Sequence, residues 1–328
     1  MQTVSLGRAG PQASRIGLGC MGMSDAYGPA DETESIATIH AAIDAGITLI
    51  DTADFYGMGH NEMLVGRALK GKPRDRVLVS VKFGALRTPT GAWGGYDARP
   101  QAVKNFAAYS LKRLGIDHID IYRPARVDPA VPIEETVGAI ADLIRSGHVR
   151  YLGLSEAGAE TLRRAHAVHS VVDLQIEYSL VSCSIEAEIL PVTRELGIAI
   201  TAYGVLSRGL LTGTLPATLN DARSRMPRFQ GENYQRNLQL TEALAAIARR
   251  RGVTPSQLAI AWVVTRGSGI IPLIGTTKRQ RLAEAIDALS IRLTKKELAE
   301  IEAAVPHEAV FGTRYAPEQM AHLDSERH

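Results

Sequence analysis

Short strand-like runs alternate with helix-like runs along most of the chain, and this alternation restricts the fold more than any other feature. Eight runs are nearly continuous in apolar and β-branched residues, which is typical of parallel strands covered on both faces. These runs are Arg15–Cys20, Ile47–Thr52, Val77–Phe83, Ile119–Arg123, Arg150–Ser155, Leu174–Tyr178, Ile198–Val205 and Gly269–Gly275. Eight β-then-α units in 328 residues predict an α/β protein with one (β/α)₈ TIM barrel domain over residues 1–328.

The segments between these runs have apolar residues three and four positions apart, which predicts helices. The expected helices are Glu32–Ala45, Asn61–Leu69, Pro100–Leu114, Ile133–Arg145, Ala159–His166, Glu186–Leu196, Asn237–Arg251, Pro255–Arg266, Arg279–Leu289 and Lys295–Ala304. A (β/α)₈ barrel needs one helix for each of its eight strands, and ten helices are expected here, so we expect two extra helices in the C-terminal region. A short hairpin is expected at Thr3–Gly7 and an irregular tail at 306–328. The alternative, a doubly wound open sheet, would normally form two lobes, and no linker marks a boundary between them.

Composition excludes several classes of function. The net charge is only +2, which gives no electrostatic drive toward nucleic acid or an anionic membrane surface. The longest apolar run, Leu258–Val264, is far shorter than the ~20 residues of a membrane-spanning helix. The two cysteines cannot supply a disulfide framework or a four-ligand zinc site, and no secretory signal is visible. We therefore expect a cytoplasmic protein that binds no metal.

Two glycine-rich motifs resemble nucleotide-binding loops without their structural context. Gly17-Leu-Gly-Cys-Met-Gly22 matches the dinucleotide fingerprint, but the next helix is expected only near Asp31, and the pyrophosphate site requires a helix N-terminus. Gly66-Arg-Ala-Leu-Lys-Gly-Lys72 matches most of a P-loop, but Pro73 stands where a magnesium-binding hydroxyl is needed. We interpret both motifs as structural.

Polar residues fall at the carboxyl ends of several predicted strands, where barrel enzymes place their catalytic groups. These residues are Asp51, Lys82, Ser155, Glu156, Gln175, Glu177 and Tyr203, with Tyr56 just beyond the second strand. Tyrosine has an ordinary pKa of ~10, and a nearby lysine ammonium would lower it, so Tyr56, Lys82 and Asp51 form a plausible proton-donor set. From spacing alone, a structural salt bridge beside a packing tyrosine explains these three residues equally well.

A series of motifs in this order resembles the aldo-keto reductases. The motifs are Asp51-Thr-Ala-Asp-Phe-Tyr-Gly57 with Asn61-Glu62 and Val65-Gly-Arg-Ala-Leu69, Val81-Lys-Phe83, Ile119-Asp-Ile-Tyr-Arg-Pro-Ala-Arg-Val-Asp-Pro129, Gly153-Leu-Ser155, Gln175-Ile-Glu-Tyr178, Ala202-Tyr-Gly-Val-Leu206, and Ile274-Gly-Thr-Thr-Lys278 with Arg281 and Glu284. The resemblance extends over residues 3–305. It implies a (β/α)₈ barrel that reduces a small-molecule aldehyde or ketone with NADPH.

The resemblance also implies roles for individual residues. Asp51, Tyr56 and Lys82 would be catalytic, with Tyr56 as the proton donor. Ser155 and Gln175 would bind the nicotinamide amide, while Tyr203 would stack on the ring. Around the rest of NADPH or NADP⁺, the implied contacts are Gly204, Val205, Leu206, Ser207 and Arg208 at the pyrophosphate, Thr277, Lys278 and Arg281 at the 2′-phosphate, Glu284 at the adenosine, and Gly275 nearby.

Two positions depart from the family pattern. Alanine occupies position 125, where the family usually has a catalytic histidine, and position 285, where it usually has an adenine-binding asparagine. The missing imidazole leaves room beside the reacting carbon, which favours a bulky or ring ketone. Strand alternation predicts that Arg123 and Arg126, which flank Ala125, point away from the site.

The changed position keeps a second class of function open, a cofactor-bound and weakly active sensor similar to potassium-channel beta subunits. A third class is a barrel isomerase that would use the basic residues after strand eight for a phosphorylated substrate. Substrate choice is expected to depend on the loops Met21–Pro29, Ala85–Arg99 and Ser207–Gln235 and on the tail from His307.

Overall fold

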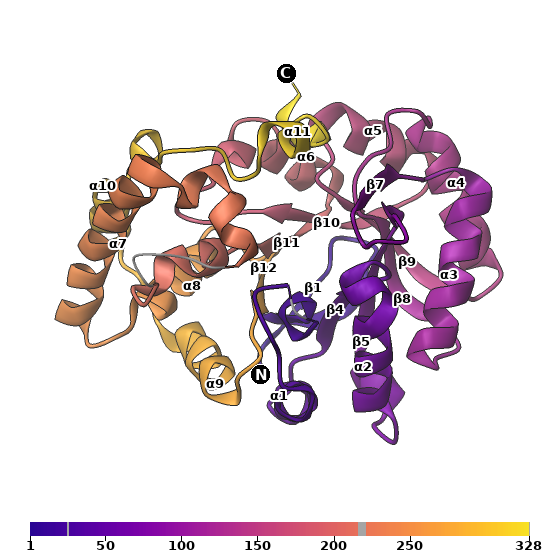
Figure 1. Ribbon diagram of the computed structural model, residues 1–328, viewed down its shortest axis with the longest axis horizontal. Coiled ribbons are helices and arrows are strands. Elements are labelled where there is room, and N and C mark those ends of the chain that lie inside the picture. Colours follow the sequence, from indigo (N-terminus) through magenta and orange to yellow (C-terminus); the bar gives the residue numbers. More distant parts are fainter. Residues whose placement is uncertain (25, 216–220, 328) are drawn as a thin grey trace.

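A closed barrel of eight parallel strands forms the centre of the computed structural model, which describes residues 1–24, 26–215 and 221–327 (Figure 1). In chain order the barrel strands are β3 (Gly17–Gly19), β4 (Leu49–Ala53), β5 (Leu78–Phe83), β8 (Ile119–Pro124), β9 (Val149–Ser155), β10 (Val171–Glu177), β11 (Ala199–Tyr203) and β12 (Ile270–Gly275). Each strand pairs with the next one in this order, and β12 pairs with β3 to close the barrel. The predicted (β/α)₈ fold and its eight strands are confirmed.

Helices surround the barrel, as Figure 1 shows. They are α1 (Glu32–Asp44), α2 (His60–Leu69), α3 (Pro100–Leu114), α4 (Ile133–Arg145), α5 (Ala159–Val168), α6 (Ile189–Leu196), α7 (Gly231–Arg251), α8 (Pro255–Thr265), α9 (Arg279–Asp287), α10 (Lys295–Ala304) and the short α11 (Pro317–Met320). The main difference from the prediction lies in the expected loop 207–235. It contains 3₁₀ turns at Ser207–Thr212, Ala222–Arg225 and Pro227–Phe229, and α7 starts within it at Gly231, six residues before the predicted Asn237. Residues 216–220 of this loop and residue 25 of the first loop lie outside the described residues.

The N-terminal hairpin covers the base of the barrel. Its strands are β1 (Thr3–Ser5) and β2 (Gln12–Ser14), so the expected segment Thr3–Gly7 supplies only the first arm. Leu6 and Ala13 are fully buried against Leu49 and Ile271 at the lower ends of the barrel strands. Apolar packing therefore fills the base, and the polar residues at the strand ends face the opposite mouth.

Both nucleotide-like glycine motifs have structural explanations. Gly17–Gly19 forms β3 and is followed by a 3₁₀ turn, while α1 begins only after Asp31, whose side chain accepts a hydrogen bond from the Glu34 amide at 2.7 Å. Gly66 lies in α2, where an added Cβ would be 2.5 Å from the Leu114 carbonyl oxygen at the end of α3. This glycine allows α2 and α3 to pack closely.

The C-terminal tail returns to the mouth of the barrel. It contains 3₁₀ turns at His307–Ala309 and Asp324–Glu326, with α11 between them. The Gly158 amide donates to the Asp324 carboxylate at 2.7 Å, and the Ser325 amide donates to the Glu156 carbonyl at 3.0 Å. A small antiparallel hairpin, β6 (Ala85–Arg87) and β7 (Trp93–Tyr96), follows β5. Among the described residues, no helix is long and apolar enough to cross a membrane.

Candidate active site

A buried ion pair between Asp51 and Lys82 links the ends of β4 and β5. The Asp51 carboxylate accepts hydrogen bonds from the Lys82 ammonium, from the Ser80 hydroxyl at 2.8 Å and from the Gln175 amide nitrogen at 2.8 Å. Lys82 also donates to the Thr52 carbonyl oxygen at 3.1 Å. Because every partner comes from a barrel strand or its end, the lysine is held in one position. We call Asp51, Ser80, Lys82 and Gln175 the strand cluster.

The loop after β4 is fixed by Asn61 at the start of α2. The Asn61 side chain accepts from the Thr52 hydroxyl at 2.7 Å and donates to the Cys20 carbonyl oxygen and the Ser24 hydroxyl, both at 2.8 Å. These bonds tie the end of β4 to the loop after β3. They position the turn that carries Tyr56.

Tyr56 lies beside the strand cluster, as the sequence motif predicts. The Lys82 ammonium is 5.0 Å from the centroid of the Tyr56 ring. The expected lowering of the tyrosine pKa is wrong for this arrangement. Burial is the largest influence and, with the Asp51 charge adding to it, raises the pKa of Tyr56 well above its ordinary value. The phenol is therefore held firmly in its protonated form.

Strained backbone is concentrated around this mouth. Within the described part of the chain, four non-glycine residues have a positive φ, namely Met58 (52°), Glu156 (52°), Ser207 (45°) and Arg208 (54°). Each of them follows a barrel strand at its carboxyl end. Such conformations cost about 1–3 kcal/mol each and are commonest at functional sites. The strain therefore marks the same end of the barrel as the strand cluster does.

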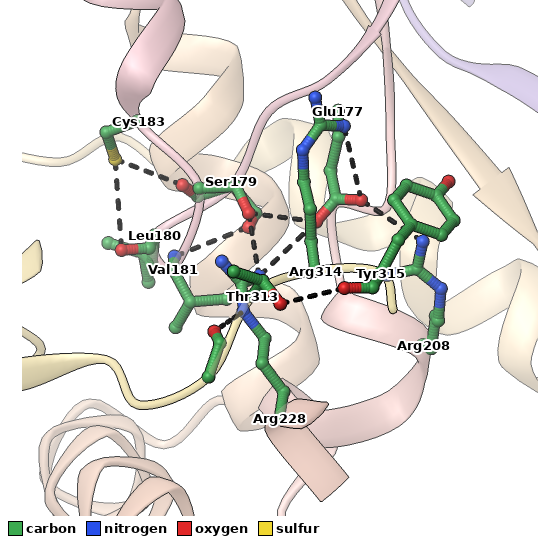
Figure 2. A network of polar contacts seen from close by, with 12 residues as sticks. Glu177, Ser179, Leu180, Val181, Cys183, Arg208, Arg228, Thr313, Arg314 and Tyr315 are labelled. Carbon is green, nitrogen blue, oxygen red and sulfur yellow. Dashed lines mark hydrogen bonds and ion pairs between the residues drawn. The ribbon is translucent and has the colours of Figure 1, made fainter. Parts of the chain in front are cut away.

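A second polar cluster joins two strand ends to distant loops. Glu177 on β10 contacts Arg208 at 3.2 Å and Arg228 at 3.4 Å (Figure 2). Glu156 after β9 binds Arg314 of the tail at 2.6 Å. We call Glu156, Glu177, Arg208, Arg228 and Arg314 the loop cluster. Burial alone would raise the pKa of Glu177, but the surrounding guanidinium groups hold that pKa below its ordinary value.

Several residues expected near a nicotinamide cofactor have buried polar atoms with no partner among the described residues. These atoms are the hydroxyls of Ser155 and Ser207 and one guanidinium nitrogen of Arg208. Since unpaired buried polar atoms cost free energy, a polar ligand at this position would satisfy them. The residues present therefore fit the carboxamide and phosphate groups of such a cofactor.

The remaining residues of the expected nicotinamide and pyrophosphate region line the same side of the mouth. The Tyr203 hydroxyl donates to Glu156 at 2.7 Å and lies 2.9 Å from the Tyr315 hydroxyl. Gly204 has a φ of 66°, and an added Cβ would be 3.0 Å from the Glu177 side chain. Val205 is buried, while Leu206 is only partly buried.

The segment after β12 presents two exposed cations. Lys278 and Arg281 are solvent-exposed and form no ion pair with any residue that the structure describes, whereas Arg279 binds Glu34 at 3.0 Å. Thr277 is partly buried beside them, and Gly275 is exposed. The Glu284 carboxylate accepts a hydrogen bond from the Thr254 hydroxyl. The two unpaired cations are available for a phosphate group.

The alanine at position 125 is buried, and its arginine neighbours do not both point away from the site. Arg123 points into the barrel, where it binds Asp173 at 2.7 Å, because residues two apart along a strand share a face. Arg126 lies two residues beyond the end of β8, where strand alternation no longer applies. Its guanidinium is 3.5 Å from the Tyr315 hydroxyl at the mouth. The prediction for these two arginines is wrong. Ala285 is buried in the core.

Several residues at the mouth were missed by sequence reasoning as site residues. They are Arg126, Arg228, Arg314 and Tyr315. Arg228 and Arg314 come from segments with no periodic pattern, and only their burial identifies them. Figure 2 shows the Tyr315 ring beside Arg208, and the guanidinium carbon is 4.6 Å from the ring centroid. Nothing in the tail sequence distinguishes this tyrosine from an ordinary surface residue.

Comparison with known proteins agrees with this geometry. The Aldo/keto reductase family model matches residues 15–306. The Glycine max protein named "Probable aldo-keto reductase 1" is 43% identical over 326 residues, covering 96% of this chain and 92% of that protein. The structure of a glycerol dehydrogenase from Gluconobacter oxydans has a TM-score of 0.82 at 31% identity, covering 93% of this chain and 96% of the other. A holo-form aldo-keto reductase from Bacillus halodurans has a TM-score of 0.78 at 26% identity, covering 94% and 97%.

The chain therefore belongs to the aldo/keto reductase family. Members of this family are oxidoreductases that use nicotinamide cofactors and act on carbonyl or alcohol groups of small molecules.

Proposed function

We propose that this protein reduces an aldehyde or ketone to an alcohol with NADPH, and that Tyr56 donates the proton. The observation that carries this proposal is the placement of Tyr56 beside a lysine that is itself fixed by Asp51. When bound, the reduced nicotinamide supplies the hydride for the carbonyl carbon. The unpaired atoms of Ser155, Ser207 and Arg208 would hold the cofactor, with Lys278 and Arg281 at its 2′-phosphate.

The protonated state of Tyr56 suits a general acid. A phenol with a raised pKa keeps its proton at neutral pH and releases it only to a strongly basic oxygen, such as the alkoxide that forms from a carbonyl. Lys82 stabilises the phenolate left behind, because an ammonium near the ring favours negative charge on the oxygen. Asp51 keeps Lys82 in place, and the Asp51 bond to Gln175 connects the proton donor to the wall of the cofactor site.

The alanine at position 125 supports a substrate with some bulk beside the carbonyl. Ala125 is buried, and its side chain is smaller than the imidazole that the family usually has at this position. We infer that a ring ketone or another bulky carbonyl compound is preferred over a small aldehyde.

A panel of carbonyl compounds, followed by NADPH absorbance, tests the proposal together with Tyr56→Phe. The variant keeps the ring and removes only the acid, so we expect a turnover loss of about 10²–10⁴-fold. Fluorescence titration should give an unchanged affinity for NADPH. More than half of the activity remaining in the variant would exclude Tyr56 as the acid. Absence of turnover across the whole panel with tight NADPH binding would favour a sensor instead.

A further inference from the structure

The guanidinium of Arg126 lies at the mouth of the barrel next to the expected nicotinamide position. One of its nitrogens donates to the Ala125 carbonyl oxygen at 2.6 Å, and the other is 3.5 Å from the Tyr315 hydroxyl. Tyr315 in turn is 2.9 Å from the hydroxyl of Tyr203. Arg126 is therefore connected to Tyr203, the expected stacking residue, through Tyr315 alone, and it directly follows the position of the missing histidine.

Arg126 also differs from the arginines of the loop cluster, because it has no carboxylate in direct contact among the described residues. In the loop cluster, three guanidinium groups meet three carboxylates, because Glu326 adds to Glu156 and Glu177 through a 2.8 Å contact with Arg314. Arg126 forms no ion pair with any residue in the described part of the chain. An arginine remains charged at any physiological pH, and the nearby Glu156 carboxylate acts on this partly buried cation without direct contact, so the guanidinium is still able to bind a carboxylate from outside the chain.

Aromatic side chains surround this cation. The Arg126 guanidinium carbon is 5.8 Å from the centroid of the Tyr315 ring. Its charge counteracts the burial that raises the pKa values of Tyr56 and Tyr96, so both phenols lie within its electrostatic reach. Tyr96 also packs edge-on against Trp93, with ring centroids 4.5 Å apart. A surface of aromatic side chains beside a guanidinium favours a ligand with a flat ring.

We propose that Arg126 binds a carboxylate carried by the substrate, so that ring-containing carbonyl compounds with a carboxylate are the preferred substrates. The inference rests on the proposed reductase function and names the substrate class of the same site. Arginine binds carboxylates in a planar, two-pronged arrangement, which orients the guest as well as attracting it. Arg126 thereby positions the substrate from the residue next to Ala125, where the usual histidine is missing.

Matched substrates isolate this contact. The 3- and 4-formylbenzoates carry the carboxylate, and their methyl esters have nearly the same shape without the charge. The acid-to-ester ratio of kcat/KM, compared between wild type and Arg126→Gln, removes the intrinsic difference in reactivity. We expect Arg126→Gln to lower the acid-to-ester ratio of kcat/KM by about 10- to 150-fold for one of the two acids, while any effect of the lost charge on Tyr56 changes acid and ester alike and cancels in the ratio.

Two further variants control for charge and folding. Arg87→Gln removes an exposed cation from the neighbouring hairpin and should leave the acid-to-ester ratio unchanged. Arg126→Lys keeps the charge but not the two-pronged geometry, so it should recover part of the preference. An unchanged melting temperature of Arg126→Gln verifies its folding. An acid-to-ester ratio of kcat/KM that is the same in wild type and Arg126→Gln overturns the inference. A loss of NADPH affinity as large as the loss of kcat/KM for the acid also overturns it, because Arg126 would then act on the cofactor.

A binding measurement separates this inference from the proposed reaction. Calorimetric titration with 4-(hydroxymethyl)benzoate, the alcohol product, reports the same contact without turnover. If the protein reduces no aldehyde but binds 4-(hydroxymethyl)benzoate only when Arg126 is present, the proposed reductase function is excluded and the anion site stands. If the protein reduces the aldehydes but wild type and Arg126→Gln bind 4-(hydroxymethyl)benzoate equally well, the proposed reductase function stands and the anion site at Arg126 is excluded.

Discussion

The strand cluster and the loop cluster flank the same mouth, but they are assembled in different ways. In the strand cluster, β4 and β5 pair in parallel with Ala53 opposite Lys82, so the barrel ladder itself brings Asp51 and Lys82 together. In the loop cluster, Glu156 meets an arginine 158 residues away that no strand carries. The first cluster is fixed by the register of the barrel, whereas the second depends on how a loop and the tail pack. We therefore expect the strand cluster to control chemistry and the loop cluster to control the stability of the mouth.

The largest expected effect on stability comes from Glu156→Gln. The Glu156 carboxylate accepts from Arg314, from Tyr203 at 2.7 Å and from Ser325, and removing its charge leaves three guanidinium groups facing only Glu177 and Glu326. Breaking a buried pair in this way costs about 3–5 kcal/mol. Urea denaturation measures the loss in the free energy of unfolding.

The matched control for that variant is Glu134→Gln. Glu134 binds Arg164 through two 2.8 Å hydrogen bonds at the surface, where such a pair contributes about 0–1 kcal/mol. Equal losses in the two variants would show that the loop cluster is no more important than a surface ion pair. Tyr56→Phe, beside the strand cluster, should leave the free energy of unfolding almost unchanged while it lowers turnover, which is the opposite of the pattern expected for Glu156→Gln.

Lys278→Ala tests whether the exposed cations after β12 select the cofactor. We expect NADPH affinity to fall by roughly 10- to 150-fold and NADH affinity to stay nearly constant, because only NADPH carries a phosphate for Lys278. Fluorescence titration of both cofactors measures the difference. Arg279→Ala is the control, since Arg279 is already bound to Glu34. Equal weakening of NADPH and NADH would show that Lys278 does not contact the 2′-phosphate.

Ala125→His restores the imidazole that the family usually has at this position. If a ring ketone is accommodated beside Ala125, the imidazole should lower kcat/KM for the ketone by about 5- to 150-fold, which corresponds to ~1–3 kcal/mol of steric cost. The same change should raise kcat/KM for a small aldehyde. Parallel changes in both substrates, in either direction, would contradict the accommodation of a bulky substrate.

The smallest expected effect concerns Asp54, at the edge of the strand cluster. Burial raises the pKa of Asp54 to about 7, above the ~3.9 of an unfolded aspartate. Between these pH values the folded state binds more protons, so Asp54 lowers stability as the pH rises from about 4 to about 7. The side chain is only partly buried, so we expect a cost of about 1 kcal/mol at pH 8.

Asp54→Asn removes that titration and preserves an acceptor for the Gly84 amide, which donates to Asp54 at 3.2 Å. The difference in melting temperature between the variant and wild type should therefore grow from pH 5 to pH 8. A constant difference over this range would show that the Asp54 pKa is not raised.

The barrel and its strand-borne residues were predictable because short-range patterns specify them. Nearly continuous apolar runs identified all eight barrel strands, and the polar residues on β4, just after it and on β5 pointed to Asp51, Tyr56 and Lys82. The direction of a side chain was harder to predict at the end of a strand than within it. The rule of alternation failed at Arg126 because β8 stops at Pro124, and a strand rule cannot orient a loop side chain.

The sequence by itself determined the number and order of the strands, and with them the neighbours across the barrel. Hydrophobic periodicity depends only on residues close together in the sequence, so it identifies each strand. Because consecutive strands pair in parallel, the strand order then tells which strand ends lie side by side. Tertiary structure alone decided the burial of Tyr56, which reversed its expected pKa shift, and the arrival of Arg314 and Tyr315 at the mouth. Burial and loop packing depend on contacts between residues far apart in the chain, and no local pattern records those contacts.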